Sequence, residues 1–216
     1  MPQNRIWLFD LDNTLHNASP HIFPHINRAM TQYLMRHLAL SQEAANALRV
    51  QYWRRYGATM LGLVRHHGTD PDHFLHVTHE FPDLPRMLVF ERALDGLLRR
   101  LPGRKVVFSN GPQAYAERVL GLTGLRRRFE AVMGVEQMGY HPKPQRRAYL
   151  AALRSLRVPA AACVLVEDTL ENLRTAHAMG MKTVWVSRQG PSAPWVSRRI
   201  GSILDLPSCA GLARYP

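Results

Sequence analysis

Cysteine is scarce in this sequence, and no long apolar run interrupts its 216 residues. The two cysteines, Cys163 and Cys209, form neither a disulfide framework nor a zinc pattern, and Cys163 lies in an apolar run typical of a buried thiol. No stretch approaches the ~20 consecutive apolar residues of a membrane-spanning helix. The N-terminus has no basic region followed by a long apolar run. We therefore expect no secretory signal, no membrane partner and a cytoplasmic location.

Acidic residues are few as well: 16, against 28 lysines and arginines, which makes the formal net charge +12. This balance favours anionic ligands. The basic residues are dispersed in short groups, however, and no nucleic-acid-binding motif or basic tail accompanies them. We expect a small phosphorylated metabolite as the partner, and no specific nucleic acid. The oligomeric state stays open.

Short apolar runs alternate with helical patterns along most of the chain. The runs that predict strands are 5–9, 105–108, 130–134, 163–166 and 182–186. Helical patterns lie between them, at 92–101, 113–120, 144–156 and 170–179. Continuous apolar strands separated by helices indicate a parallel sheet that is covered on both faces. We predict an α/β fold with a Rossmann-like parallel-sheet core.

The long segment between the first two strand runs has a different pattern. Apolar side chains recur there at helical spacing, as at Ile26, Met30 and Tyr33, and no strand run is evident. Ser41 and Asp70, the latter before a proline, are typical helix N-caps. We predict an all-helical domain inserted after the first strand. The predicted boundaries are 1–15 and 90–216 for the α/β core and 16–89 for the insertion.

Polar residues stand where the apolar runs end. They are Asp10 and Asp12 after the first run, Ser109 and Asn110 after the second, and Glu167 and Asp168 after the fourth. Ligands of parallel sheets bind beyond the carboxyl ends of the strands, so we expect these side chains to meet in one crevice. Paired carboxylates can bind a hard cation, or one can attack phosphorus while the other transfers protons. Lys143, between two prolines, can neutralise a phosphate dianion.

Together these residues resemble the four motifs of the haloacid dehalogenase superfamily. The motifs are Asp10-x-Asp12-x-Thr14, Ser109, Lys143, and Glu167-Asp168 followed by Asn172. The resemblance covers nearly the whole chain. It implies a Mg²⁺-dependent phosphatase with a helical cap of the C1 type, because the predicted insertion falls where that cap is placed.

The resemblance also implies a role for each residue. Asp10 would attack phosphorus to form an aspartyl-phosphate, and Asp12 would transfer protons to the leaving oxygen and from water. Ser109 and Lys143 would complete the catalytic set by holding the phosphoryl group. The implied metal ligands are Asp10, Asp12, Asp168 and Glu167. Asn110, from its place after the second run, is expected to bind phosphate oxygens, and Thr14 of the first motif is a further expected substrate contact.

Two positions bear on the chemistry. Dehalogenase members lack the second carboxylate of the first motif, so Asp12 indicates phosphoryl chemistry. Many relatives have an aspartate where this chain has Asn172, and asparagine can hydrogen-bond to Lys143 but cannot pair its charge.

The substrate class depends on the inserted segment. Its stretch 56–63 (YGATMLGL), with Ser-Asn-Gly at 109–111, resembles the pyrimidine 5′-nucleotidase branch, which hydrolyses nucleoside monophosphates such as UMP and CMP. Tyr56 would stack on the base, Thr59 would hydrogen-bond to base or sugar, and His66 would reach the substrate. The simpler alternatives are that Tyr56 packs on a helix face and that Thr59 caps the next helix.

Other interpretations are weaker. A phosphatase of another small ester, such as phosphoglycolate or a sugar phosphate, or a phosphomutase, remains the alternative activity. A regulatory module without catalysis is disfavoured, because every catalytic side chain is present. The histidines at 66–79 invite a zinc site, but solvated side chains explain them more simply.

Overall fold

The computed structural model describes residues 5–191 and 193–214. The chain divides into two compact units. One contains the residues up to Asn17 together with those from Val89 on, and the other is Ala18–Leu88. We refer to them as the sheet unit and the helical unit.

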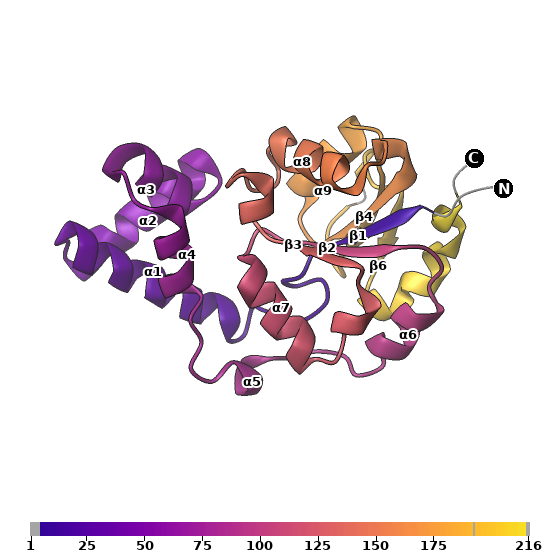
Figure 1. Cartoon of the computed structure of the whole chain (residues 1–216), viewed down its shortest axis with the longest axis horizontal. Helices are drawn as coiled ribbons and strands as arrows, with labels where there is room; N and C mark the ends of the chain where they lie inside the picture. Colours follow the sequence, from indigo (N-terminus) through magenta and orange to yellow (C-terminus); the bar gives the residue numbers. More distant parts are fainter. Residues whose placement is uncertain (1–4, 192, 215–216) are drawn as a thin grey trace. The chain divides into compact units, whose positions relative to one another are not determined.

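The sheet unit is built on a parallel sheet (Figure 1). Its strands are β1 (Ile6–Phe9), β2 (Lys105–Phe108), β3 (Ala131–Met133), β4 (Cys163–Glu167), β5 (Lys182–Val186) and β6 (Arg198–Ile200). Within the described residues they lie in the order β3-β2-β1-β4-β5-β6, each parallel to its neighbours. The predicted α/β class is confirmed, and the five predicted strands end within one residue of their predicted limits.

Helices cover both faces of the sheet. Figure 1 shows α6 (Leu94–Arg100) and α7 (Gln113–Leu122) below it, with α8 (Arg146–Leu156) and α9 (Leu170–Ala178) above it. The chain runs from β1 outward to β2 and β3, then returns to β4 and continues outward on the other side. The strand order therefore reverses beside β1, and such a reversal opens a crevice at the carboxyl ends of the strands.

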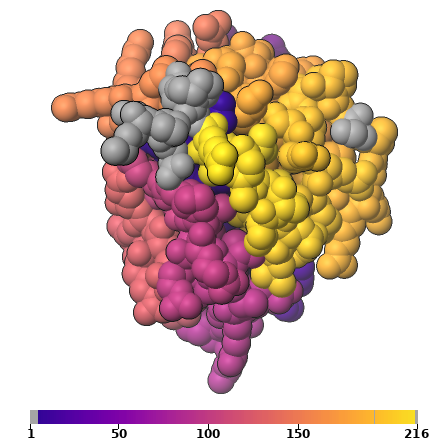
Figure 2. All heavy atoms as spheres, turned by 90° about the vertical axis from the view of Figure 1, so that its right-hand side faces the viewer, coloured from indigo at the N-terminus to yellow at the C-terminus, as the bar shows by residue number. Residues whose placement is uncertain are grey.

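The sixth strand was not predicted. β6 has only three residues, two of them exposed arginines, and it forms an edge of the sheet. A short, charged edge strand has no apolar run to reveal it, and such strands resist pairing with other chains. The chain after it forms the 3₁₀ segment η4 (Ile203–Ala213), which packs against α6, as the yellow and magenta regions of Figure 2 show. Shorter 3₁₀ turns are η1 (Arg126–Arg128), η2 (Glu136–Met138) and η3 (Ala160–Ala162).

The core of the sheet unit is apolar and buried. All four residues of β1 are buried, as are both cysteines, which are free. Burial raises the pKa of the Cys163 thiol to about 12, as expected for an inert core cysteine.

The helical unit contains no strand among its described residues. Its helices are α1 (Ile22–Leu38), α2 (Gln42–Tyr56), α3 (Thr59–His67), α4 (Pro71–Thr78) and α5 (Leu84–Met87). Ser41 and Asp70 cap α2 and α4 by accepting hydrogen bonds from backbone N–H groups, as predicted. The unit has its own core, which includes Ile22, Leu34 and Phe74. No helix of the described chain is long and apolar enough to cross a bilayer.

Candidate active site

Three adjacent strands end at the same edge of the sheet and carry the predicted polar residues there. Asp10 follows β1, and its N–H donates to the carbonyl of Val166 at 3.0 Å. Ser109 follows β2, while Glu167 is the last residue of β4. The turn after Asp10 is tight because Asn13 takes a left-handed conformation (φ 62°), which asparagine tolerates better than most residues. Strand adjacency thus brings together residues that lie over 150 positions apart in the chain.

Lys143 is the centre of this site. It is 2% exposed, and its Nζ donates to Asp10 Oδ1 at 2.8 Å, to Glu167 Oε2 at 2.7 Å and to the Phe108 carbonyl at 2.7 Å. These three bonds use all three N–H groups of the ammonium. Burial opposes the charge of Lys143, yet the neighbouring Asp10 and Glu167 raise its pKa above the ordinary value.

The charge partner of Lys143 therefore differs from the sequence-based expectation. Asn172 is buried, and its backbone carbonyl accepts a hydrogen bond from the Tyr149 hydroxyl at 2.8 Å. Glu167 instead pairs with the lysine. The asparagine at this position leaves no charge unpaired, because β4 itself supplies the carboxylate.

Asn110 holds Lys143 rather than standing free. Its Oδ1 accepts from the Lys143 N–H at 2.7 Å, and its Nδ2 donates to the Lys143 carbonyl at 3.0 Å. Both polar atoms of the amide are thereby committed to one backbone segment. This pair of bonds fixes the lysine loop against the end of β2, a positioning role that spacing alone did not indicate.

Three carboxylates gather around the single ammonium. Asp10, Glu167 and Asp168 offer oxygen atoms that lie within 4.8 Å of one another. Burial raises the pKa of Asp10 to about 7, Glu167 adds to this shift, and Lys143 opposes it. Burial also raises the pKa values of Glu167 and Asp168. Excess negative charge among hard oxygen ligands fits a divalent cation such as Mg²⁺, which would relieve the repulsion.

The predicted Thr14 and Ser109 lie at this site as well. Thr14 is 3% exposed, and its hydroxyl donates to Asp10 Oδ2 at 3.2 Å. The Ser109 Oγ accepts from the Gly111 N–H at 3.0 Å, which leaves its own proton available as a donor. The Thr14 hydroxyl thus points into the polar cluster, whereas the Ser109 hydroxyl is bonded within its own turn.

Asp12 has two partners that the sequence did not reveal. Its Oδ1 accepts from the Tyr115 hydroxyl at 2.6 Å and contacts His16 Nε2 at 2.9 Å. Burial is the larger cause that raises the pKa of Tyr115, and the charge of Asp12 adds to it, so the phenol stays protonated. Tyr115 lies on the inner face of α7, where its spacing is that of any core aromatic, so only the fold identifies it as a partner.

Of the three predicted contacts in the helical unit, Tyr56 and His66 lie together and Thr59 does not join them. The Tyr56 hydroxyl lies 2.5 Å from His66 Nε2, and the guanidinium groups of Arg55 and Arg65 lie 5.5 and 5.8 Å from its ring. Thr59 is buried, and its hydroxyl donates to the Arg49 carbonyl of α2 at 3.1 Å. The expectation that Thr59 caps α3 is therefore wrong: Ala58 holds the cap position, and the hydroxyl joins two helices instead.

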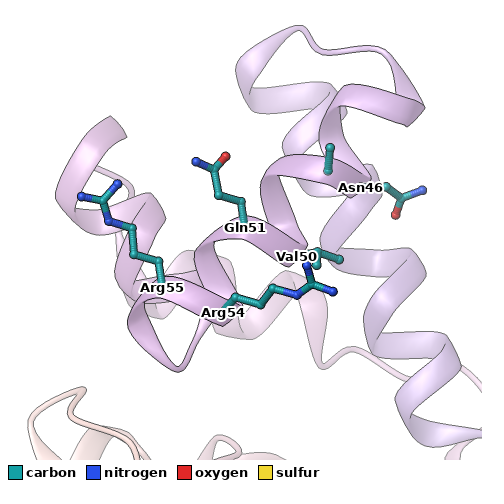
Figure 3. A pocket seen from close by; sticks show the side chains of 6 residues that line it. Asn46, Val50, Gln51, Arg54 and Arg55 are labelled. Atoms are coloured by element: carbon teal, nitrogen blue, oxygen red, sulfur yellow. The ribbon is translucent and has the colours of Figure 1, made fainter.

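Other features of the helical unit do not resemble a site. Among the described residues, the only group of three or more metal-binding side chains is the carboxylate cluster of the sheet unit, so the histidines at 66–79 form no such group. An open hollow lies beside α2 (Figure 3). Its lining residues are Asn46, Ala47, Val50, Gln51, Arg54 and Arg55. None of them belongs to the predicted site.

A parallel sheet that gathers carboxylates and a buried lysine beyond its carboxyl edge defines an α/β enzyme. The chain matches the haloacid dehalogenase-like hydrolase family over residues 5–180, and it belongs to that family. The superfamily inferred from the four motifs is thereby confirmed.

Individual relatives are distant. The chain is 24% identical over 195 residues to phosphate metabolism protein 8 of Saccharomyces cerevisiae, covering 83% of this chain and 60% of the yeast protein. It therefore spans less than two thirds of that relative. A HAD phosphatase from Thermococcus onnurineus is similar in structure, with a TM-score of 0.66, 22% identity and coverage of 98% and 100%. An L-2-haloacid dehalogenase from Xanthobacter autotrophicus has a TM-score of 0.61, 16% identity and coverage of 97% and 99%. The fold alone thus does not separate the two chemistries.

Proposed function

We propose that this hydrolase is a Mg²⁺-dependent phosphatase that forms an aspartyl-phosphate on Asp10 and acts on nucleoside 5′-monophosphates, those of pyrimidines foremost. The observation that carries the phosphatase proposal is Asp12, a second carboxylate on the Asp10 turn that is held by hydrogen bonds. A dehalogenase needs no acid for a halide leaving group, whereas an ester oxygen needs a proton. The name of the yeast relative, which refers to phosphate metabolism, agrees with this choice.

In the first step an Asp10 oxygen attacks phosphorus, and the bond between phosphorus and the ester oxygen breaks. Asp12 gives its proton to that oxygen. Lys143 holds the phosphoryl group by charge, with the Ser109 hydroxyl as a further donor. Asn110 keeps Lys143 in place through the two backbone bonds described above.

In the second step a water molecule attacks the phosphoryl group on Asp10, and Asp12 takes the water's proton. The bond between Asp10 and phosphorus breaks, which releases inorganic phosphate and restores the Asp10 carboxylate and the proton on Asp12. Mg²⁺, when bound by Asp10, Asp168 and the Asp12 carbonyl, would neutralise charge on the phosphoryl oxygens. Both oxygens of Glu167 accept hydrogen bonds from the protein, so its contribution to the metal would be indirect.

The substrate proposal rests on the helical unit. Tyr56 offers an aromatic face, His66 a polar partner, and Arg55 and Arg65 positive charge. Aromatic rings with adjacent cations bind nucleobases by stacking. The committed hydroxyl of Thr59 makes it a packing residue first, and a substrate contact only after rearrangement.

Phosphate release with Mg²⁺ tests the proposal. UMP and CMP should be hydrolysed faster than phosphoglycolate and sugar phosphates, and an acid-quenched reaction should contain a phosphorylated peptide that includes Asp10. Asp10→Asn should lower turnover by about 10⁴-fold or more. The reverse substrate order would remove the nucleotidase assignment and leave a phosphatase. An isomerised product without net phosphate release would indicate a mutase, and turnover by Asp10→Asn would exclude Asp10 as the nucleophile.

A further inference from the structure

The carboxylate of Asp12 is held at one oxygen by two donors, one nearby in the sequence and one over 100 residues away. Tyr115 approaches from α7 and His16 from the segment that follows the Asp10 turn. The Tyr115 oxygen also lies 3.4 Å from His16 Nε2, so the three polar groups form a closed triangle. Tyr115 is 2% exposed and His16 is 4% exposed.

The His16 ring is held in one tautomer by this arrangement. Its Nδ1 is buried and has no hydrogen-bond partner among the described residues. With the proton on Nδ1, a buried N–H would have no acceptor. With the proton on Nε2, that N–H donates to Asp12 and only a lone pair on Nδ1 is left without a donor, which costs less. His16 therefore donates through Nε2 to Asp12 Oδ1.

The Tyr115 ring is fixed by packing as well as by its hydroxyl. A Cβ atom added to Gly111 would lie 3.2 Å from Tyr115 Cδ1 and 3.4 Å from Ser109 Oγ. Gly111, on the turn that carries Ser109, thus lies close to the ring, where a larger residue would crowd it.

We propose that Tyr115 and His16 are positioning residues that orient Asp12, so that its Oδ2 alone exchanges the proton in both steps of the reaction. Oδ1 already accepts two hydrogen bonds, which leaves Oδ2 to give a proton to the leaving oxygen and to take one from water. The inference rests on the proposed function. It adds to that function two residues outside the four motifs and a defined oxygen atom.

Leaving-group dependence tests this inference. Phenyl phosphate and p-nitrophenyl phosphate have nearly the same shape, but only the first needs a proton on its leaving oxygen. Tyr115→Phe should lower kcat/KM for phenyl phosphate by ~10-fold or more and for p-nitrophenyl phosphate by less than ~3-fold. With p-nitrophenyl phosphate, kcat should fall and phosphorylated enzyme should accumulate, because the second step needs the same carboxylate.

Variants of His16 separate position from packing. His16→Leu should reproduce the selective loss, whereas His16→Gln, whose amide N–H can reach the place of Nε2, should stay within ~3-fold of the parent enzyme. Tyr33→Phe is the matched control, because it removes a buried tyrosine hydroxyl bonded to His73 in the helical unit at 2.9 Å. In Tyr33→Phe, the ratio of kcat/KM between phenyl phosphate and p-nitrophenyl phosphate should not change.

If Tyr115→Phe loses kcat/KM equally on both substrates, or loses none, the positioning role is overturned. Asp12→Asn should show the same selectivity more strongly. If Asp12→Asn affects both substrates equally, Asp12 is not the acid, and the proposed mechanism falls together with the inference. If Asp12→Asn is selective and Tyr115→Phe is not, only the inference fails.

Discussion

The two units of this chain hold their polar groups in opposite ways. In the sheet unit, Lys143 is buried and all its donors are used by groups of fixed position. In the helical unit, Tyr56 is only half-buried and has one hydrogen bond, to His66, with two arginines beside its ring. Fully paired buried networks have one favourable arrangement, whereas exposed clusters rearrange at little cost. This contrast agrees with the proposal that the sheet unit performs the chemistry and the helical unit contacts the substrate.

Removal of Lys143 should have the largest effect on stability. Lys143→Met leaves Asp10 and Glu167 buried without their cation, which should lower the free energy of unfolding by about 3–5 kcal/mol at pH 8. Urea denaturation without divalent cations measures this. Lys105→Met is the control, since that half-buried lysine donates to the Gly103 carbonyl and pairs with no buried carboxylate among the described residues; its loss should cost less than ~1 kcal/mol. Similar losses in the two variants would contradict the expected cost of leaving Asp10 and Glu167 buried without their cation.

Addition of Mg²⁺ should stabilise the sheet unit selectively. At a concentration 100 times its Kd, the ion should add about 2.7 kcal/mol. Hydrogen exchange should slow in β4 and α9, and slow less in α2. Asp168→Asn should weaken the effect, while Asp72→Asn in the helical unit should leave it intact. Equal protection in both units would contradict a metal site confined to the sheet unit.

A substitution in the helical unit should speed hydrogen exchange there and leave the sheet unit unchanged. A Cβ atom at Gly62 would lie 2.2 Å from Tyr52 Cγ, so Gly62→Ala forces α2 and α3 apart. We expect a loss of about 1–3 kcal/mol, read as faster hydrogen exchange in those helices. Gly121→Ala in α7, where no heavy atom beyond the helix's own backbone and chain neighbours lies within 4 Å of the added Cβ, should instead stabilise by about 0.5–1 kcal/mol. Unchanged exchange in α2 of Gly62→Ala would show that the helices accommodate the methyl group.

The smallest effect on stability should come from Tyr56. Tyr56→Phe removes one half-buried hydrogen bond to His66 and should change the free energy of unfolding by less than ~1 kcal/mol. If the exposed cluster binds the substrate, KM for UMP should rise about 3-fold with kcat unchanged, the mark of lost uniform binding. Trp53→Phe, at an exposed position on α2, should alter neither constant. A fall in kcat alone would move Tyr56 from binding to chemistry.

Much of the sheet unit was predictable because local signals and long-range packing agree there. Buried parallel strands must be continuously apolar, and their polar ends must face one crevice, so the strand runs and the residues after them could be read together. β6 was missed because an edge strand with Arg198 and Arg199 has no such signal. Thr59 was misread because a hydroxyl at a helix start is typical of a cap, while here it bonds to another helix.

The sequence by itself determined the class of fold, the family, and the carboxylates and lysine that define the site. These depend on the order of residues along each strand and turn, which the chain carries locally. The tertiary structure alone decided how those groups are paired. Glu167 rather than Asn172 balances Lys143, Asn110 clamps the lysine loop, and Tyr115 with His16 holds Asp12. Each pairing joins segments that are brought together only when the sheet forms or the turn after Asp10 closes, and hydrogen bonds act over about 3 Å whatever the separation in sequence.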